Sequence, residues 1–126
     1  MSATVLVVDD DPVYLEVAKE RLERAGFVVE TRDQAIGTSE WIVEHEPDAV
    51  LLDQMMPALN GSALAQILVK RGVRTAVILH SSKSAVELAE LVRTTGAVGA
   101  IPKSLDESLF LREFERLVGR STRLRS

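Results

Sequence analysis

Five short apolar runs, separated by longer stretches with helical spacing, constrain the fold of this 126-residue chain more than any other feature. The runs have the length of strands, and three of them are almost continuously apolar. Strands covered on both faces have this composition, and strands that alternate with helices form parallel βαβ units. The sequence therefore predicts an α/β domain around a parallel sheet. The predicted strands are Thr4–Val8, Phe27–Thr31, Ala49–Leu52, Ala76–Leu79 and Val98–Ile101.

The polarity of the runs predicts which strands are central. The first, third and fourth runs are the apolar ones, so we place them in the middle of the sheet. The second run is half polar, which favours a place nearer an edge. The fifth run ends at Pro102, and a proline cannot donate a hydrogen bond to a neighbouring strand. We therefore expect the fifth strand at an edge.

Helical patterns fill the stretches between the strands. The first helix begins with the pair Asp11-Pro12, in which the aspartate caps the helix and the proline occupies its first position. Its apolar stripe ends at Gly26. The second helix is the least regular, because residues 37–39 are Gly-Thr-Ser. We expect the second helix at about residues 35–45, the third at about 60–71 and the fourth at about 84–95. The fifth contains the apolar stripe formed by Phe110, Leu111, Phe114, Leu117 and Val118.

Composition fits one domain with one core. Hydrophobic residues make up 46% of the chain, and there is no cysteine, which excludes disulfides, thiolate zinc sites and cysteine nucleophiles. That composition is compatible with a reducing cytosol, so we expect a cytoplasmic protein. No apolar run approaches the roughly 20 residues that span a bilayer, so we expect no membrane segment. We place the domain at residues 1–119 and interpret residues 120–126 as a basic tail, either frayed or the start of a linker.

The charge balance argues against nucleic-acid binding and points to an acidic site. The chain has 15 Lys and Arg against 19 Asp and Glu, a formal net charge of −4. Residues 1–60 hold 13 of the acids and only 4 of the bases. Such crowding of acids in the first half of the chain indicates an acidic site.

Polar side chains follow the strands that we place near the centre of the sheet. Ligands of open parallel sheets bind outside the carboxyl ends of the strands, where Asp9, Asp10, Asp53, Ser81 and Lys103 are expected to converge. Carboxylates that meet without compensation repel each other, and an oxygen-only ligand set suits Mg²⁺. A carboxylate can also act as the nucleophile of phosphoryl transfer. Asp53 could be that nucleophile, with the lysine and the serine stabilising the phosphoryl oxygens.

Four motifs together resemble the receiver domain family of bacterial two-component response regulators, which includes single-domain chemotaxis regulators. The resemblance covers nearly the whole chain. The motifs are VLVVDDDP at residues 5–12, LLDQMMP at residues 51–57 followed by Asn60-Gly61, VILHS at residues 77–81 and GAIPK at residues 99–103. The resemblance implies a doubly wound, flavodoxin-like three-layer sandwich whose five parallel strands have the order 2-1-3-4-5.

The resemblance also assigns functions to residues. Asp53 would be the phosphoacceptor, and Mg²⁺ would be held by Asp9, Asp10, Asp53 and the backbone carbonyl of Met55. Ser81 and Lys103 would stabilise the phosphoryl group. A histidine kinase or a phosphotransfer protein would be the donor, and a downstream protein would bind the face formed by residues 84–95, 98–101 and 110–118. Homodimerisation is left open, and neither nucleic acid nor membrane is an expected partner.

Two positions depart from the family pattern. Ala100 stands three residues before the lysine, where the family usually has the aromatic residue of its switch. Ser104 follows the lysine in place of the usual proline, which removes the usual reason for a cis peptide bond, since a non-proline cis bond costs about 3 kcal/mol. Both departures bear on how a signal leaves the domain rather than on phosphorylation.

Two other functions stay open at this point. The first is an atypical receiver that binds a partner constitutively, without phosphorylation. The second is a phosphate-monoester hydrolase with an aspartate nucleophile, which normally needs a second acid two residues later, where this chain has Met55. A flavin-binding domain of the same fold is set aside, because three aspartates follow the first strand and would repel the flavin phosphate.

Overall fold

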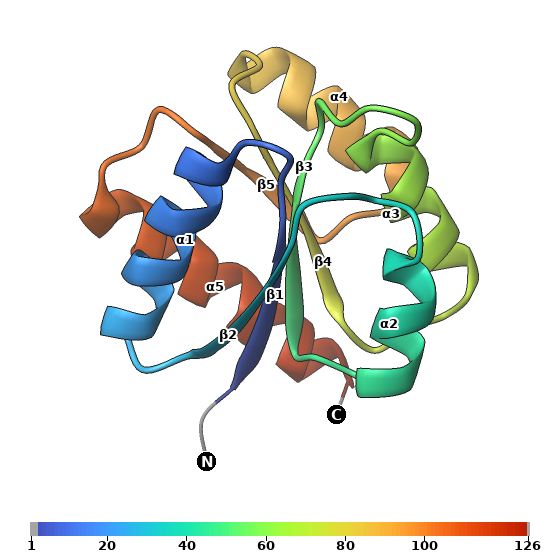
Figure 1. Ribbon diagram of the computed structural model, residues 1–126, viewed down its shortest axis with the longest axis horizontal. Coiled ribbons are helices and arrows are strands. Elements are labelled where there is room, and N and C mark those ends of the chain that lie inside the picture. Colours follow the sequence, from blue (N-terminus) through green and yellow to red (C-terminus); the bar gives the residue numbers. More distant parts are fainter. Residues whose placement is uncertain (1–2, 126) are drawn as a thin grey trace.

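The computed structural model describes residues 3–125, with side chains through Gly119. Within these residues, five strands and five helices alternate along the chain (Figure 1). The elements are β1 (Thr4–Val8), α1 (Pro12–Arg24), β2 (Val28–Arg32), α2 (Thr38–His45), β3 (Ala49–Asp53), α3 (Gly61–Lys70), β4 (Ala76–Ser81), α4 (Ala85–Thr95), β5 (Gly99–Pro102) and α5 (Glu107–Arg125).

The five strands form one parallel sheet with the order β2-β1-β3-β4-β5. This confirms the predicted fold class and strand order. The half-polar β2 and the proline-terminated β5 are the two edge strands, as their composition indicates. β3 and β4 are buried at every position, because helices cover them on both faces.

Helices cover the sheet in two layers, so the domain is a three-layer sandwich. In Figure 1, α1 and α5 lie on one face of the sheet, and α2, α3 and α4 lie on the other. The core divides in the same way. Val7, Leu22, Ile78, Phe110 and Phe114 belong to the cluster beneath α1 and α5. The cluster on the opposite face includes Leu6, Val8, Ile42, Leu64, Leu68 and Leu79.

The start of α1 has the geometry that its sequence predicts. The side chain of Asp11 accepts a hydrogen bond from the backbone N–H of Val13 at 2.9 Å, and Pro12 is the first helical residue. Ala18 and Leu22 face the core. Asp11 is therefore a helix cap. Asp9 and Asp10, which precede it, are the acidic residues at the carboxyl end of β1.

The second helix begins later than the sequence suggests, at Thr38 rather than near residue 35. Gly37 adopts φ +83°, a left-handed conformation that glycine accepts readily and that separates the helix from the preceding loop. Arg32 holds this loop, because its Nε donates to Thr38 Oγ1 at 2.9 Å and its Nη2 donates to the carbonyl of Ile36 at 3.1 Å. A side chain from the edge strand thus stabilises the loop and the first residue of α2.

The end of the chain also differs from expectation. Helix α5 continues through Arg125, so the backbone of residues 120–125 is helical where we expected a frayed end or a linker. Ser126 lies outside the described residues, and the boundary at residue 119 stays a prediction. No helix within the described part of the chain is both long enough and apolar enough to cross a membrane.

Candidate functional site

The carboxyl ends of the strands converge at the upper edge of the sheet in Figure 1. Asp9 comes directly after β1, Asp53 is the last residue of β3, and Lys103 comes directly after β5. The parallel register pairs Val8 with Leu52, so Asp9 and Asp53 are at equivalent positions on neighbouring strands. The topology therefore brings together residues that are up to 94 positions apart in the sequence.

Three carboxylates meet at this edge. One carboxylate oxygen from each of Asp9, Asp10 and Asp53 lies within 4.8 Å of the other two. Asp9 and Asp53 are buried, at 2% and 4% exposure, whereas Asp10 is exposed. The backbone N–H of Asp11 donates to Asp9 Oδ1 at 2.9 Å and orients that carboxylate. The site thus has a buried floor and one acidic side chain open to solvent.

Lys103 lies between the two buried carboxylates. Its Nζ is 2.8 Å from Asp9 Oδ2 and 3.1 Å from Asp53 Oδ1, and its side chain is only 8% exposed. Burial by itself lowers the pKa of this ammonium, but the hydrogen bonds and negative charges of Asp9 and Asp53 outweigh burial and raise the pKa. The lysine is therefore a permanent cation at the centre of the site.

The pKa of Asp53 is raised above its usual value. Burial is the largest cause, and repulsion from Asp9 acts in the same direction. The hydrogen bond and charge of Lys103 oppose both effects without cancelling them, and the backbone N–H of Met55 contributes a further opposing hydrogen bond. Asp53 is thus a carboxylate that the site holds in a less favourable environment than water.

The donor set fits a divalent cation. Three carboxylates supply only hard oxygen ligands, and one lysine cannot compensate three negative charges. Mg²⁺ is usually bound by one or two carboxylates, and its remaining positions are filled by water or phosphate oxygens. Asp9, Asp10 and Asp53 are the residues that would hold it. The arrangement can therefore bind a metal ion beside a phosphoryl group.

Ser81 and Met55 have different environments at this edge. Ser81 is the last residue of β4 and is fully buried, and its Oγ accepts a hydrogen bond from the backbone N–H of Lys83 at 3.2 Å. The side chain of Met55 is 64% exposed. The roles expected for the Ser81 hydroxyl and for the Met55 carbonyl stay predictions.

The two departures from the family pattern have clear structural counterparts. Ala100 packs against the cluster beneath α2, α3 and α4, so its small side chain takes the place of an aromatic residue on that face of the sheet. No peptide bond among the described residues is cis, and this includes the bond between Lys103 and Ser104. The loop after β5 is therefore built without the usual proline geometry.

The loop after β3 is held against the strand by close packing. The Gln54 side chain accepts a hydrogen bond from the backbone N–H of Ser62 at 2.7 Å and donates to the Ser62 hydroxyl at 3.1 Å. Gly61 packs directly on the strand, because a Cβ at this position would lie 2.2 Å from the carbonyl oxygen of Asp53. The start of α3 therefore packs against the backbone of Asp53 and restricts its movement.

Replacing Gly61 by alanine is expected to destabilise the domain by about 2 kcal/mol, since the backbone of Asp53 must move to admit a methyl group. Alanine is otherwise the better helix former, so the clash has to overcome a favourable propensity. Gly119→Ala is the matched control, because nothing lies within 4 Å of a Cβ at that helical position. Urea unfolding should show a loss for Gly61→Ala and no loss for Gly119→Ala. Equal stability of the two variants would contradict the packing argument.

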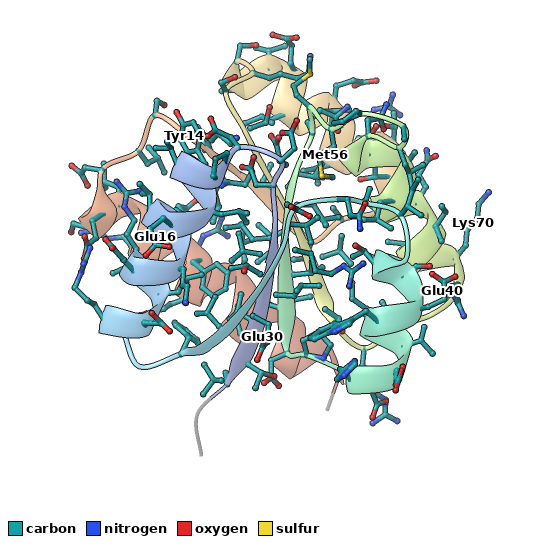
Figure 2. All side chains as sticks on the ribbon, in the orientation of Figure 1. Tyr14, Glu16, Glu30, Glu40, Met56 and Lys70 are labelled. Atoms are coloured by element: carbon teal, nitrogen blue, oxygen red, sulfur yellow. The ribbon has the colours of Figure 1, made fainter. Side chains whose placement is uncertain are left out.

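Sequence reasoning missed Tyr14, which joins the site from α1. Its ring lies beneath the ammonium of Lys103, with Nζ 4.1 Å from the ring centroid, and Figure 2 shows Tyr14 at the upper end of α1. A signal was present in the sequence. Tyr14 precedes Ala18 and Leu22 by one and two helical steps of four residues, which places it on the inward stripe beside the acidic end of β1.

His80 is buried on the same side of the sheet. Its exposure is 6%, and its ring lies between Tyr14 and Phe110, with centroids 6.5 Å and 5.4 Å away. Burial, together with the positive charges of Lys103 and Arg21, lowers the pKa of His80 to about 3. The imidazole is therefore neutral at physiological pH and serves as part of the core.

His80 should make stability depend on pH. The unfolded chain takes up a proton near pH 6.5, but the folded domain does so only near pH 3, so stability is lost as the pH falls below about 6.5. His80→Leu should remove about 2 kcal/mol of the loss that occurs between pH 7 and pH 5. The measurement is urea unfolding of both proteins with a chelator present. Parallel pH profiles for the two proteins would show that the buried imidazole is protonated normally.

Comparison with known proteins gives a consistent result. The family model described as the response regulator receiver domain matches residues 5–115. The response regulator MprA of Mycobacterium ulcerans is 32% identical over 111 residues, which cover 86% of this chain and 48% of that protein. The probable C4-dicarboxylate response regulator DctR of Priestia megaterium is 32% identical over 102 residues, covering 79% of this chain and 45% of that protein.

The solved structures agree with the sequence relatives. The receiver domain of the Francisella response regulator 1452 superposes with a TM-score of 0.85 at 26% identity, covering 95% of this chain and 99% of that one. The chain spans about half the length of the two curated relatives. The similarity therefore concerns their receiver portion.

Proposed function

The chain belongs to the response regulator receiver domain family, and on that premise we propose that Asp53 accepts a phosphoryl group from a histidine kinase or a phosphotransfer protein. Receiver domains are signalling switches of two-component systems. Phosphorylation would change what the domain binds, so it would act as a switch and not as an enzyme that turns over a substrate. A cytoplasmic location is part of this proposal.

One observation carries the proposal. Asp53 is buried beside a second carboxylate, that of Asp9, and the Lys103 ammonium lies between the two acids, 2.8 Å from Asp9 and 3.1 Å from Asp53. A structural ion pair needs one acid for one base, whereas this cluster has an excess of acid, and burial together with repulsion from Asp9 raises the pKa of Asp53. Perturbed acids of this kind are typical of reactive sites.

The proposed reaction is a displacement at phosphorus. A carboxylate oxygen of Asp53 attacks the phosphoryl group, the bond from phosphorus to the donor nitrogen breaks, and the donor histidine keeps the electron pair. The product is an acyl phosphate on Asp53. The Lys103 ammonium is already within hydrogen-bond distance of the attacking Asp53 side chain, so it can neutralise charge on a phosphoryl oxygen without a large movement.

A bound Mg²⁺ would supply positive charge to the phosphoryl oxygens during this transfer. Asp9, Asp10 and the acceptor itself would hold the ion, together with the backbone carbonyl of Met55. Ser81 would donate its hydroxyl hydrogen to a phosphoryl oxygen, because its Oγ only accepts from the Lys83 N–H and its hydrogen stays available. Because Asp10 and Met55 are exposed, a donor protein can approach the site from this edge.

We further propose that a downstream protein binds the face formed by α4, β5 and α5. Val86 of α4 is 81% exposed, whereas Leu88 of the same helix is buried in the core. The choice of face follows from membership of the receiver domain family, and an exposed valine on α4 is compatible with it. Pairing of two copies of the domain through this face stays a prediction.

The test is the intact mass of the protein after incubation with Mg²⁺ and acetyl phosphate. A single phosphoryl adduct is expected, and it should be lost in Asp53→Asn and when a chelator replaces the metal. Asp33→Asn is the matched control, because it removes an exposed acid near the same edge and should leave the adduct intact. Loss of the adduct in the control, or its persistence in Asp53→Asn, would contradict the assignment.

Ala100 favours one alternative, a receiver that binds its partner constitutively. This alternative predicts that the adduct forms, or fails to form, without any change on the α4-β5-α5 face. Amide chemical shifts of that face before and after phosphorylation distinguish the two functions. Shifts confined to the phosphorylation site would favour the constitutive module.

A further inference from the structure

The two faces of the sheet differ in how they connect to the phosphorylation site. Ala100 packs toward α2, α3 and α4, where its methyl group offers little surface to carry a movement. Along β4 the side chains alternate between faces, so His80 lies on the opposite face from Leu79. The aromatic residues near the site, Tyr14 and Phe110, lie on this opposite face with α1 and α5.

A continuous set of contacts starts at the Lys103 ammonium and leads along that face. Nζ of Lys103 lies over the ring of Tyr14 at 4.1 Å, and the Tyr14 ring meets His80 edge-on at 6.5 Å. His80 in turn contacts Phe110, at 5.4 Å between ring centroids. Phe110 is fully buried in the first turns of α5. The contacts thus join the site directly to the start of that helix.

The same contacts close into a ring. The guanidinium of Arg21 lies 5.4 Å from the centroid of Phe110, and its Nη1 donates to the carbonyl of Leu105 at 3.2 Å. Leu105 is two residues after Lys103 in the loop between β5 and α5. An ion pair between Arg24 and Glu107, with Nε 3.0 Å from Oε2, ties the same two helices together further along α1. These contacts join Lys103, α1 and the start of α5 in one cluster.

We propose that Tyr14 is a positioning residue for Lys103, and that its ring transmits the state of Asp53 to the first turn of α5. This inference rests on the proposed function. A phosphoryl group adds negative charge at Asp53 and draws the ammonium away from the aromatic ring, which weakens the contact with Tyr14. When Tyr14 moves, the neutral ring of His80 cannot follow without shifting Phe110, because both side chains are buried in a closely packed core.

The first test compares Tyr14→Phe with Tyr14→Leu, because phenylalanine keeps the ring that faces the ammonium and leucine removes it. With acetyl phosphate and Mg²⁺, Tyr14→Phe should take up the phosphoryl group within about twofold of the wild-type rate. Tyr14→Leu should be slower by about fivefold, the size expected for loss of a partly buried cation–π contact. Phe27→Leu is the matched control, since it removes an aromatic ring from the same face that contacts Phe114 and not Lys103.

The second readout follows the signal itself. Tyr14 is the only tyrosine of the chain, so labelling with 3-fluorotyrosine gives a single ¹⁹F resonance. Addition of Mg²⁺ and beryllofluoride, a phosphoryl mimic, should shift this resonance in the wild type and leave it in place in Asp53→Asn. Amide shifts of Leu105 to Phe110 should follow in the wild type and in Tyr14→Phe, and shrink at least twofold in Tyr14→Leu.

The outcomes separate this inference from the function on which it rests. Absence of any phosphoryl adduct in the wild type overturns both. An adduct that forms at the same rate in Tyr14→Leu as in the wild type, with unchanged amide shifts in α5, overturns the role of Tyr14 alone. Equal slowing in Tyr14→Leu and Phe27→Leu would show that only packing is affected, and it overturns the inference too.

Discussion

Replacing Lys103 by methionine is expected to lower the free energy of unfolding by about 3 kcal/mol at pH 7 when no divalent cation is present. The lysine side chain is nearly inaccessible and is the cation between the carboxylates of Asp9 and Asp53. Methionine fills a similar volume, so the loss comes from charge rather than from a cavity. Two buried carboxylates are then left to repel each other without compensation.

Urea unfolding with a chelator present measures this loss. Stability of Lys103→Met should recover as the pH falls and the carboxylates are protonated, and it should recover at pH 7 when Mg²⁺ is added. Lys70→Met is the control, because Lys70 is an exposed lysine of α3 that is labelled in Figure 2. A Lys103→Met protein as stable as the wild type at pH 7 would mean that the lysine does not hold the acids together.

Replacing Asp53 by asparagine is expected to have the opposite effect on stability. The pKa of Asp53 is raised, so the folded domain binds its proton more tightly than the unfolded chain does. A raised pKa gives stability that is fully present at low pH and is lost as the pH rises through the folded value. At pH 7 the charged side chain therefore opposes folding, and the neutral amide should raise the free energy of unfolding by about 1 kcal/mol.

The pH profile tests this sign directly. Asp53→Asn should be more stable than the wild type at pH 7 without metal, and the difference should disappear below the usual pKa of an aspartate. Asp33→Asn, an exposed substitution, should show no such trend. A gain in stability together with complete loss of phosphorylation would show that Asp53 is reactive and that its charged side chain lowers the free energy of unfolding. A less stable Asp53→Asn protein would show instead that the acid stabilises the fold.

The sheet could be predicted because its strands are almost continuously apolar. β3 and β4 are buried on both faces, so only central positions in the sheet suit them. The proline at the end of β5 indicates an edge position. The start of α2 could not be predicted in this way. It depends on hydrogen bonds from Arg32 to the following loop and on the left-handed conformation of Gly37, and the pattern of apolar residues contains no signal for either.

The site shows the same division. Asp9, Asp53 and Lys103 could be grouped from the sequence alone, because each lies at the carboxyl end of a strand, and the carboxyl ends of parallel strands meet at one edge of the sheet. Tyr14 and His80 could not be grouped with them, since their contact depends on how the start of α1 is placed beside the carboxyl end of β4. A spacing of four residues put Tyr14 on the inward face, but which cation that face would meet is decided by the fold.

Trapping the acyl phosphate on its residue tests the central claim most directly. Borohydride reduces an aspartyl phosphate to homoserine, which survives digestion and can be located by peptide sequencing. After treatment with acetyl phosphate and Mg²⁺, the account predicts homoserine at position 53 and nowhere else among the 19 acidic residues of the chain. Homoserine at position 9 or 10, or no homoserine in a protein that carries the phosphoryl adduct, would contradict it.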